Sequence, residues 1–168
     1  LVPKKNLPNY SEFYEMRHFE PANEELDYIE YPGEEEQEWI PFGMQQIFYC
    51  PQMEGLTVAA EICEDLWVPQ PPSITHAIAG ANVIVNLSAS DEITGKDSYR
   101  RNLVGGQSAR LVCGYIYADA GEGESSTDLV FAAHNLIAEN GTILAQSKRF
   151  ENEIVTAALD IHRIRAER

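Results

Sequence analysis

The apolar run NVIVNLS at residues 82–88 constrains the fold more than any other segment. A short run of this kind is typical of a strand that is buried on both faces. The segments GLTVAAEIC before it and YIYADA after it also have strand character. Helical segments, SITHAIAGA and DSYRRNLVGGQSARLVC, lie between the three strands. This alternation predicts a layered α/β domain.

The rest of the chain is predicted to be shorter elements. Residues 1–23 read as a strand end, a turn and a short helix, NYSEFYEMRHF, and the tail HRIRAER begins another helix. After YIYADA come the predicted strands DLVFAA, NLIAE, TILAQS and EIVTAALD, and Asn140-Gly141 is a strong hairpin signal. Pro32-Gly33 predicts a second hairpin between LDYIEY and EWIPF. The acidic segment Glu24–Glu38 around it is interpreted as a solvated face, a decorated insertion or a surface for a basic partner.

Charge and composition exclude several classes of function. The 168 residues carry 12 Lys and Arg against 27 Asp and Glu, a formal net charge of −15. Nucleic acid and anionic lipid both require clustered cations, so neither is an expected partner. No apolar run approaches the roughly 20 residues that span a bilayer, and no secretory signal opens the sequence. Three scattered cysteines suit neither a disulfide framework nor a metal cluster. We expect a reduced, cytoplasmic globular protein.

The segment EICEDLWVPQPPS is the sharpest candidate for chemistry. Cys63 ends a predicted strand and enters a sharp turn, which is the geometry of a nucleophile beside free backbone N–H groups. Cys50 and Cys113 are interpreted as inert core thiols, the commoner fate of a free cysteine. The neighbouring carboxylates suppress a thiolate, so a nucleophile here needs a nearby cation and a proton acceptor. The candidate cations are Lys4, Lys5, Lys96, Arg100 and Arg101, and no histidine has Cys–His or metal-ligand spacing.

Several motifs in one order carry a resemblance to a known family. They are VPKKNLPNYSEFYE, EICEDLWVPQPPS, AGANVIVNLSAS, GKDSYRRNLV and YADAGEGESSTDLVF. Together they resemble the amidase domain of glutamine-dependent NAD synthetases, a branch of the nitrilase (carbon–nitrogen hydrolase) superfamily. The resemblance runs from Leu1 to about Phe150 and implies the later part of an α-β-β-α sandwich. The chain is therefore expected to be one glutamine amidohydrolase domain, incomplete at its N-terminal side.

The resemblance implies a Glu–Lys–Cys triad that hydrolyses the side-chain amide of glutamine. The cysteine of the family falls on Cys63 and its lysine on Lys4. Glu12 matches an additional glutamate that positions this lysine. The general-base glutamate lies upstream of the lysine in the family, where this sequence has only Leu1, Val2 and Pro3. These 168 residues alone are therefore expected to be inactive.

The resemblance also assigns the groups that bind the substrate. Glu64 suits the α-ammonium of glutamine, while Ser90 and Lys96 suit its α-carboxylate. Tyr10 and Trp67 are expected to wall the pocket. The alternatives from the residues alone are a polar strand end at Ser90 and a solvated loop cation at Lys96.

The resemblance further implies the partners. The ammonia would pass to a synthetase domain of the same polypeptide, which would use ATP and magnesium to convert deamido-NAD to NAD. Within the present chain no cofactor is expected, and relatives suggest a homo-oligomer. Two other hypotheses stay open: a stand-alone nitrilase-superfamily amidase acting on another amide, and a catalytically silent interaction module.

Overall fold

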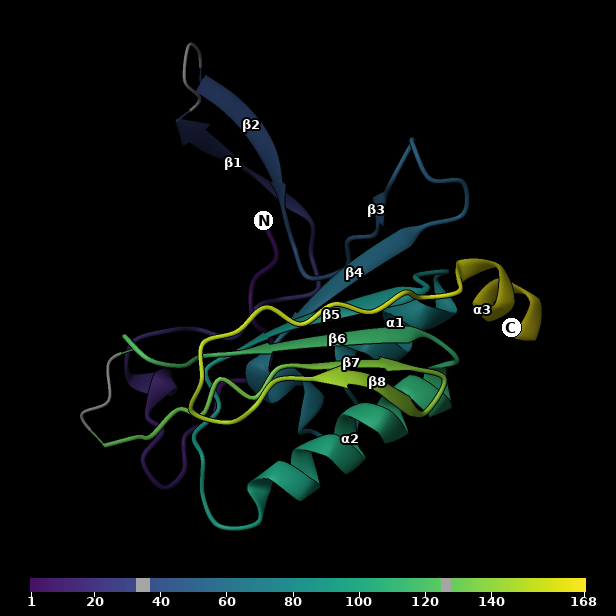
Figure 1. Cartoon of the computed structure of the whole chain (residues 1–168). Helices are drawn as coiled ribbons and strands as arrows, with labels where there is room; N and C mark the ends of the chain where they lie inside the picture. The colour runs from purple at the N-terminus through teal and green to yellow at the C-terminus, as the bar shows by residue number, and fades with distance from the viewer. Residues whose placement is uncertain (33–36, 125–127) are drawn as a thin grey trace.

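A six-stranded mixed sheet is the centre of the molecule in the computed structural model, which describes residues 1–32, 37–124 and 128–168 (Figure 1). The strand order follows the chain: β3 (Phe48–Tyr49), β4 (Thr57–Ile62), β5 (Val83–Ser88), β6 (Gly114–Asp119), β7 (Leu136–Glu139) and β8 (Thr142–Gln146). β4, β5 and β6 are parallel, and the outer strands are antiparallel to their neighbours. The predicted layered α/β domain is confirmed.

Two helices connect the parallel strands. α1 (Pro72–Ile78) links β4 to β5, and α2 (Lys96–Leu111) links β5 to β6. Crossovers between parallel strands are right-handed, so two successive crossovers in one direction place both helices on the same face of the sheet. α1 packs on β4, and α2 packs on β6, β7 and β8. The buried core of the sheet lies beneath them and includes Ile84, Val104, Tyr115 and Leu136.

Of the two glycines inside α2, Gly105 lies close to the β7–β8 turn, whereas a Cβ on Gly106 would have no neighbour within 4 Å. A Cβ on Gly105 would lie 3.4 Å from the carbonyl oxygen of Gly141. Asn140 and Gly141 have φ values of 42° and 88°, the left-handed conformations of a type I′ hairpin turn. The hairpin predicted from this dipeptide is confirmed.

A separate hairpin of β1 (Asp27–Pro32) and β2 (Gln37–Phe42) projects from the sheet (Figure 1). It matches the hairpin predicted within the acidic segment Glu24–Glu38. Residues 33–36 of that segment, including the predicted turn at Gly33, lie outside the described residues.

Four predicted elements are wrong. The strand end expected at the start of the chain is absent, because residues 1–14 contain no strand. The helix expected in NYSEFYEMRHF is only a 3₁₀ turn, η1 (Glu15–Arg17). DLVFAA contributes an isolated bridge between Phe131 and Asp91, and EIVTAALD runs along the sheet without pairing as a strand in the described structure. The last helix, α3 (Ile161–Glu167), is as predicted. Of the helices in the described ranges, none combines the length and the apolar character needed to cross a membrane.

Candidate active site

The candidate site lies at one edge of the sheet, where the three parallel strands end. Cys63 directly follows β4, Ser90 follows β5 by two residues, and Asp119 is the last residue of β6. The register pairs Ile62 with Leu87 and Ser88 with Asp119, so the strand ends are adjacent. The carboxyl ends of parallel strands are the usual place for a ligand site in open α/β sheets.

The backbone of Cys63 is in a strained conformation. Its φ is 47°, in the left-handed region that non-glycine residues rarely adopt. It begins the 3₁₀ turn η2 (Cys63–Leu66) and is 8% exposed. The buried Asn86 side chain on β5 accepts a hydrogen bond from the Cys63 N–H at 3.2 Å and donates one to the Cys63 carbonyl at 3.4 Å. Strain that neighbours hold in this way is common at active sites.

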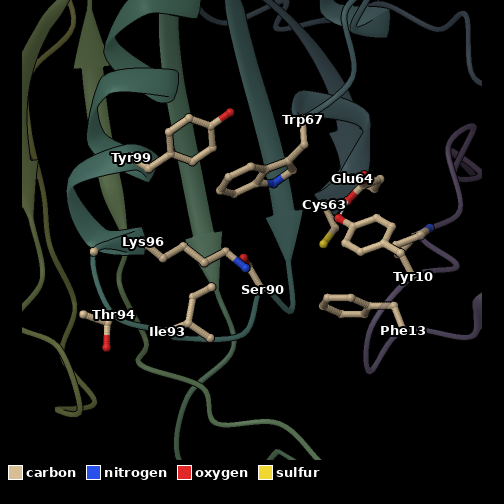
Figure 2. A pocket seen from close by; sticks show the side chains of 12 residues that line it. Tyr10, Phe13, Cys63, Glu64, Trp67, Ser90, Ile93, Thr94, Lys96 and Tyr99 are labelled. Atoms are coloured by element: carbon tan, nitrogen blue, oxygen red, sulfur yellow. Dashed lines mark hydrogen bonds between the residues drawn. The ribbon is translucent and has the colours of Figure 1, made fainter.

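Two cavities meet at Cys63. The first, which we call the Trp67 cavity, has a volume of about 320 Å³ and contains all the predicted substrate-binding residues along its wall: Tyr10, Glu64, Trp67, Ser90 and Lys96 (Figure 2). The second, the Lys4 cavity, has a volume of about 690 Å³ and is lined by Lys4, Glu15, Ser88 and Asp119, among others. Cys63 lines both, so the structure brings the predicted nucleophile, lysine and binding residues to one place.

Lys4 is held by a carboxylate other than the predicted one. Its ammonium forms a bidentate ion pair with Glu15, with Nζ to oxygen distances of 2.7 and 2.6 Å. Glu12 is exposed and lies three residues away, before η1 begins. In the structure Lys4 therefore pairs with Glu15 and not with Glu12, the residue that the resemblance pointed to. Lys5, the neighbouring candidate cation, pairs with Glu24 at the surface.

Glu64 and Tyr10 form a hydrogen-bonded pair beside Cys63. The Tyr10 hydroxyl donates to Glu64 Oε2 at 3.0 Å. Burial raises the pKa of Glu64, although the Tyr10 hydroxyl and the Lys4 and Lys96 charges oppose that shift. Burial and the adjacent Glu64 carboxylate raise the pKa of the Tyr10 hydroxyl, which keeps it a hydrogen-bond donor at neutral pH.

Lys96 starts α2 and extends toward Ser90 in Figure 2. Its ammonium forms a short ion pair with Asp91 and lies 5.2 Å from the centre of the Trp67 ring. The other side of that ring is near Tyr99, with a centroid separation of 5.3 Å. The alternative of a solvated loop cation does not describe Lys96, because only 15% of its side chain is exposed.

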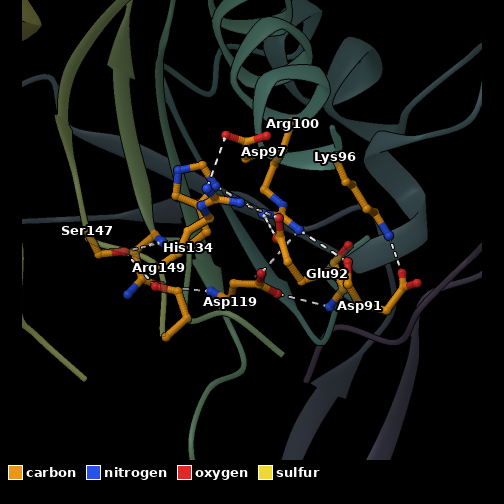
Figure 3. Close-up of polar contacts among 12 residues, drawn as sticks. Asp91, Glu92, Lys96, Asp97, Arg100, Asp119, His134, Ser147 and Arg149 are labelled. Atoms are coloured by element: carbon orange, nitrogen blue, oxygen red, sulfur yellow. Dashed lines mark hydrogen bonds and ion pairs between the residues drawn. The ribbon is translucent and has the colours of Figure 1, made fainter. Parts of the chain in front are cut away.

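A buried ion cluster centred on Arg100 supports the loop that carries Ser90 (Figure 3). The Arg100 guanidinium, which is fully buried, contacts Glu92 and His134 at 3.0 Å and Asp119 at 3.7 Å. Asp119 Oδ1 in turn accepts a hydrogen bond from the Ser90 N–H at 2.9 Å. The cluster therefore links α2, β6 and the Ser90 loop.

The other two cysteines lie outside both cavities. Cys113 is completely buried, and burial raises the pKa of its thiol to about 12. Cys50 is partly buried and contacts Gln52. No group of three or more His, Cys, Asp or Glu suited to a metal ion occurs within the described ranges.

Sequence reasoning missed two residues that build the site. Asn86 lies in the apolar run at residues 82–88, where a buried amide needs a hydrogen-bond partner. Glu15 is the second residue, because the resemblance pointed to Glu12, whereas Lys4 pairs with Glu15 three residues further along the chain.

Known proteins are similar to this chain in sequence and in fold. The glutamine-dependent NAD(+) synthetase of Mycobacterium tuberculosis H37Rv is 42% identical over 170 aligned positions, which cover 100% of this chain and 24% of that protein. The crystal structure of such a synthetase from Cytophaga hutchinsonii has a TM-score of 0.69 and 27% identity over 87% of this chain and 22% of its own. The carbon-nitrogen hydrolase of Helicobacter pylori G27, 17% identical, shares the fold with a TM-score of 0.73 over 97% of this chain and 53% of its own. No protein-family model matches the chain.

The sheet and the helices that cover it have the nitrilase-type fold of carbon–nitrogen hydrolases. The chain spans about a quarter of the length of the curated relatives it matches. It is similar in sequence over its full length, and in fold over most of its length, to part of the glutamine-dependent NAD(+) synthetases.

Proposed function

We propose that this domain hydrolyses glutamine to glutamate and ammonia with Cys63 as the nucleophile. The observation that carries the proposal is the position of Cys63 between the Trp67 cavity and the Lys4 cavity. One cavity offers a carboxylate and a cation for the two charges of an amino acid, and the other offers a lysine beside the thiol. The names of the relatives support glutamine as the substrate.

In the proposed reaction the Cys63 thiolate attacks the carboxamide carbon. Lys4 stabilises the oxyanion that develops, helped by the backbone N–H of Glu64. The C–N bond then breaks and ammonia leaves with a proton from the general base. Water hydrolyses the resulting thioester, which releases glutamate and restores the thiol. Loss of one oxyanion donor typically lowers the rate by about 10²–10³.

Glu64 and Lys96 are proposed to select for an amino acid over a simple amide. The α-ammonium of glutamine would pair with Glu64, and its α-carboxylate with Lys96 and Ser90. Lys96 would have to exchange its Asp91 partner, at least in part, for the substrate carboxylate. The flat sides of Tyr10 and Trp67 would enclose the carbon chain between these charges.

The wider setting is also a proposal. The general-base glutamate that the family carries upstream of its lysine would come from outside residues 1–168, so this segment alone should release little glutamate. The ammonia would supply an ATP- and magnesium-dependent synthetase domain of the same polypeptide, which would convert deamido-NAD to NAD. We also propose that the enzyme is cytoplasmic and forms a homo-oligomer.

The decisive test measures glutamate and ammonia released by the complete polypeptide that carries this sequence. Cys63→Ala should abolish both products, while Cys50→Ala, a cysteine outside both cavities, should leave them within about two-fold. Acetamide and asparagine should be poor substrates compared with glutamine. Equal turnover of a simple amide would favour the stand-alone amidase, and no turnover of any amide by the unsubstituted protein would favour the silent module.

A further inference from the structure

Asp65 connects two segments of the chain, one that carries the predicted nucleophile Cys63 and one that carries the predicted lysine, Lys4. Its side chain is almost fully buried, with 2% exposure. Oδ1 accepts hydrogen bonds from the backbone N–H of Asn6 at 2.8 Å and from its Nδ2 at 2.9 Å. Oδ2 accepts a hydrogen bond from the Ile62 N–H at 3.0 Å. The carboxylate thus contacts its own turn and also Asn6, which lies 59 residues before Asp65 in the chain.

The positions of its partners give this contact a consequence for the site. Asn6 follows Lys4 by two residues, and Ile62 directly precedes Cys63. We infer that Asp65 is a positioning residue that holds Lys4 in register with Cys63, an inference that rests on the proposed function of these two residues. It acts on the reaction only through them.

The Lys4 segment needs such an anchor because it has little regular structure. Residues 1–14, all of which are described, lie in neither a helix nor a strand. The pairing of Lys4 with Glu15 is internal to the N-terminal region and does not fix its distance from the sheet. The two hydrogen bonds between Asn6 and Asp65 do fix it, because Asp65 belongs to η2 together with Cys63.

The Cys63 side of the contact needs an anchor for a different reason. A left-handed backbone at Cys63 persists only if its neighbours over-determine it. Asn86 holds the N–H and carbonyl of Cys63, and Asp65 holds the N–H of the residue before it. The same carboxylate therefore fixes the positions of both the Cys63 segment and the Lys4 segment.

The chemistry of the contact requires a carboxylate. Three N–H donors converge on Asp65, and an ionised carboxylate is the side chain that only accepts hydrogen bonds. Asp65→Asn keeps the shape of the side chain. Its new NH₂ group, however, would face N–H donors of either Asn6 or Ile62, and those hydrogen bonds would be lost. A negative charge near the thiol opposes thiolate formation. If the residue at position 65 served only to fill space, an uncharged side chain would therefore be expected there.

The test is a double-mutant cycle between Asp65 and Lys4 in the complete polypeptide. Asp65→Asn should lower kcat for glutamine hydrolysis by about 10–10²-fold, the cost of displacing a catalytic group by an ångström or less, with a change in KM of less than about three-fold. In a Lys4→Met background the same change should lower the residual rate by less than about three-fold. Independent effects that multiply would overturn the inference.

A second measurement works without any turnover of glutamine. Alkylation of Cys63 by iodoacetamide, followed by peptide mapping, reports how readily its thiolate forms at each pH. Loss of the Asp65 charge by itself would ease thiolate formation and move the onset of alkylation to lower pH. A shift to higher pH in Asp65→Asn, in the direction that Lys4→Met gives, therefore reports displacement of Lys4, and the double variant should lie at no higher pH than Lys4→Met. A shift to lower pH in Asp65→Asn would overturn the inference. If the unsubstituted protein reacts with iodoacetamide but does not hydrolyse glutamine, the proposed function fails while the positioning role is still decided.

Two further variants separate positioning from a general loss of structure. Glu61→Gln changes another buried carboxylate, on β4, whose partners are Tyr115 and the Ser73 N–H rather than the Lys4 segment. It should reduce stability without coupling to Lys4. If Asp65→Asn fails to fold, Asn6→Asp tests the same contact from the other side and should couple to Lys4 in the same way. Equal behaviour of the Glu61 and Asp65 variants in the cycle would refute the inference.

Discussion

The carboxyl group of Asp119 should make the free energy of unfolding fall as the pH rises from 4 to 7. Its side chain is completely buried at the wall of the Lys4 cavity. Burial raises its pKa from 3.8 to about 6, even though the Ser90 N–H and the Arg100 guanidinium lower it. Arg100 is 3.7 Å from Oδ2, too far for a hydrogen bond that would stabilise the ionised form fully.

The size of the effect follows from the shift. About two pKa units correspond to about 3 kcal/mol, at about 1.4 kcal/mol per unit. Because the folded protein holds this proton more tightly than the unfolded chain, the contribution is complete below pH 3.8 and is lost as the pH rises through about 6. Most of it, about 2–3 kcal/mol, disappears between pH 4 and pH 7.

The assay compares the unsubstituted protein with Asp119→Asn by urea unfolding at pH 4, 5, 6 and 7. The asparagine variant lacks the titrating group, so its stability relative to the unsubstituted protein should rise by about 2–3 kcal/mol across this range. Asp128→Asn, at an exposed site, controls for the loss of one carboxylate. A difference that stays constant with pH, or that falls as the pH rises, would refute the reasoning about burial.

Two other predictions concern the Lys4 ion pair and a strained helix end. Glu15→Gln should lower the rate of glutamine hydrolysis by at least about ten-fold because it weakens the ion pair with Lys4. Glu12→Gln should change the rate by less than two-fold. The opposite ranking in a glutamate-release assay would support Glu12 as the residue that positions Lys4. Val112 ends α2 with a φ of 46°, a conformation that costs a β-branched residue about 1–2 kcal/mol. Val112→Gly should therefore raise the free energy of thermal unfolding by about 1 kcal/mol, and a lower value would show that the packing of the valine outweighs the strain.

The sheet could be predicted because its signals are local. The apolar run at residues 82–88 and the Asn140-Gly141 turn specify a buried strand and a hairpin whatever surrounds them. The N-terminal region could not be predicted in the same way. Phe13 lies in the segment that was predicted to be a helix, but its side chain lines the Trp67 cavity together with Tyr10, which is hydrogen-bonded to Glu64. Contacts with distant residues outweigh helix propensity there.

The site residues also differ in whether a local sequence signal predicts them. Cys63 could be found from its place at a strand end, which is a local signal. Lys4 and the binding residues came from the family resemblance, because their proximity to Cys63 depends on segments far apart in the chain. The carboxylate that holds Lys4 could not be resolved between Glu12 and Glu15 without coordinates, since the choice depends on where η1 begins.

The carboxylates around Cys63 were the main objection to a nucleophile at this position, and the structure removes most of it. Glu61 and Glu64 both have pKa values raised by burial, which shifts each toward its neutral form. Glu61 accepts hydrogen bonds from the Tyr115 hydroxyl and a backbone N–H, so its oxygens face the interior. The oxygens of Asp65 are occupied by three N–H donors. Glu61 and Asp65 therefore stabilise the fold around the Cys63 turn, and Lys4 in the adjacent cavity faces less opposing charge than the sequence suggests.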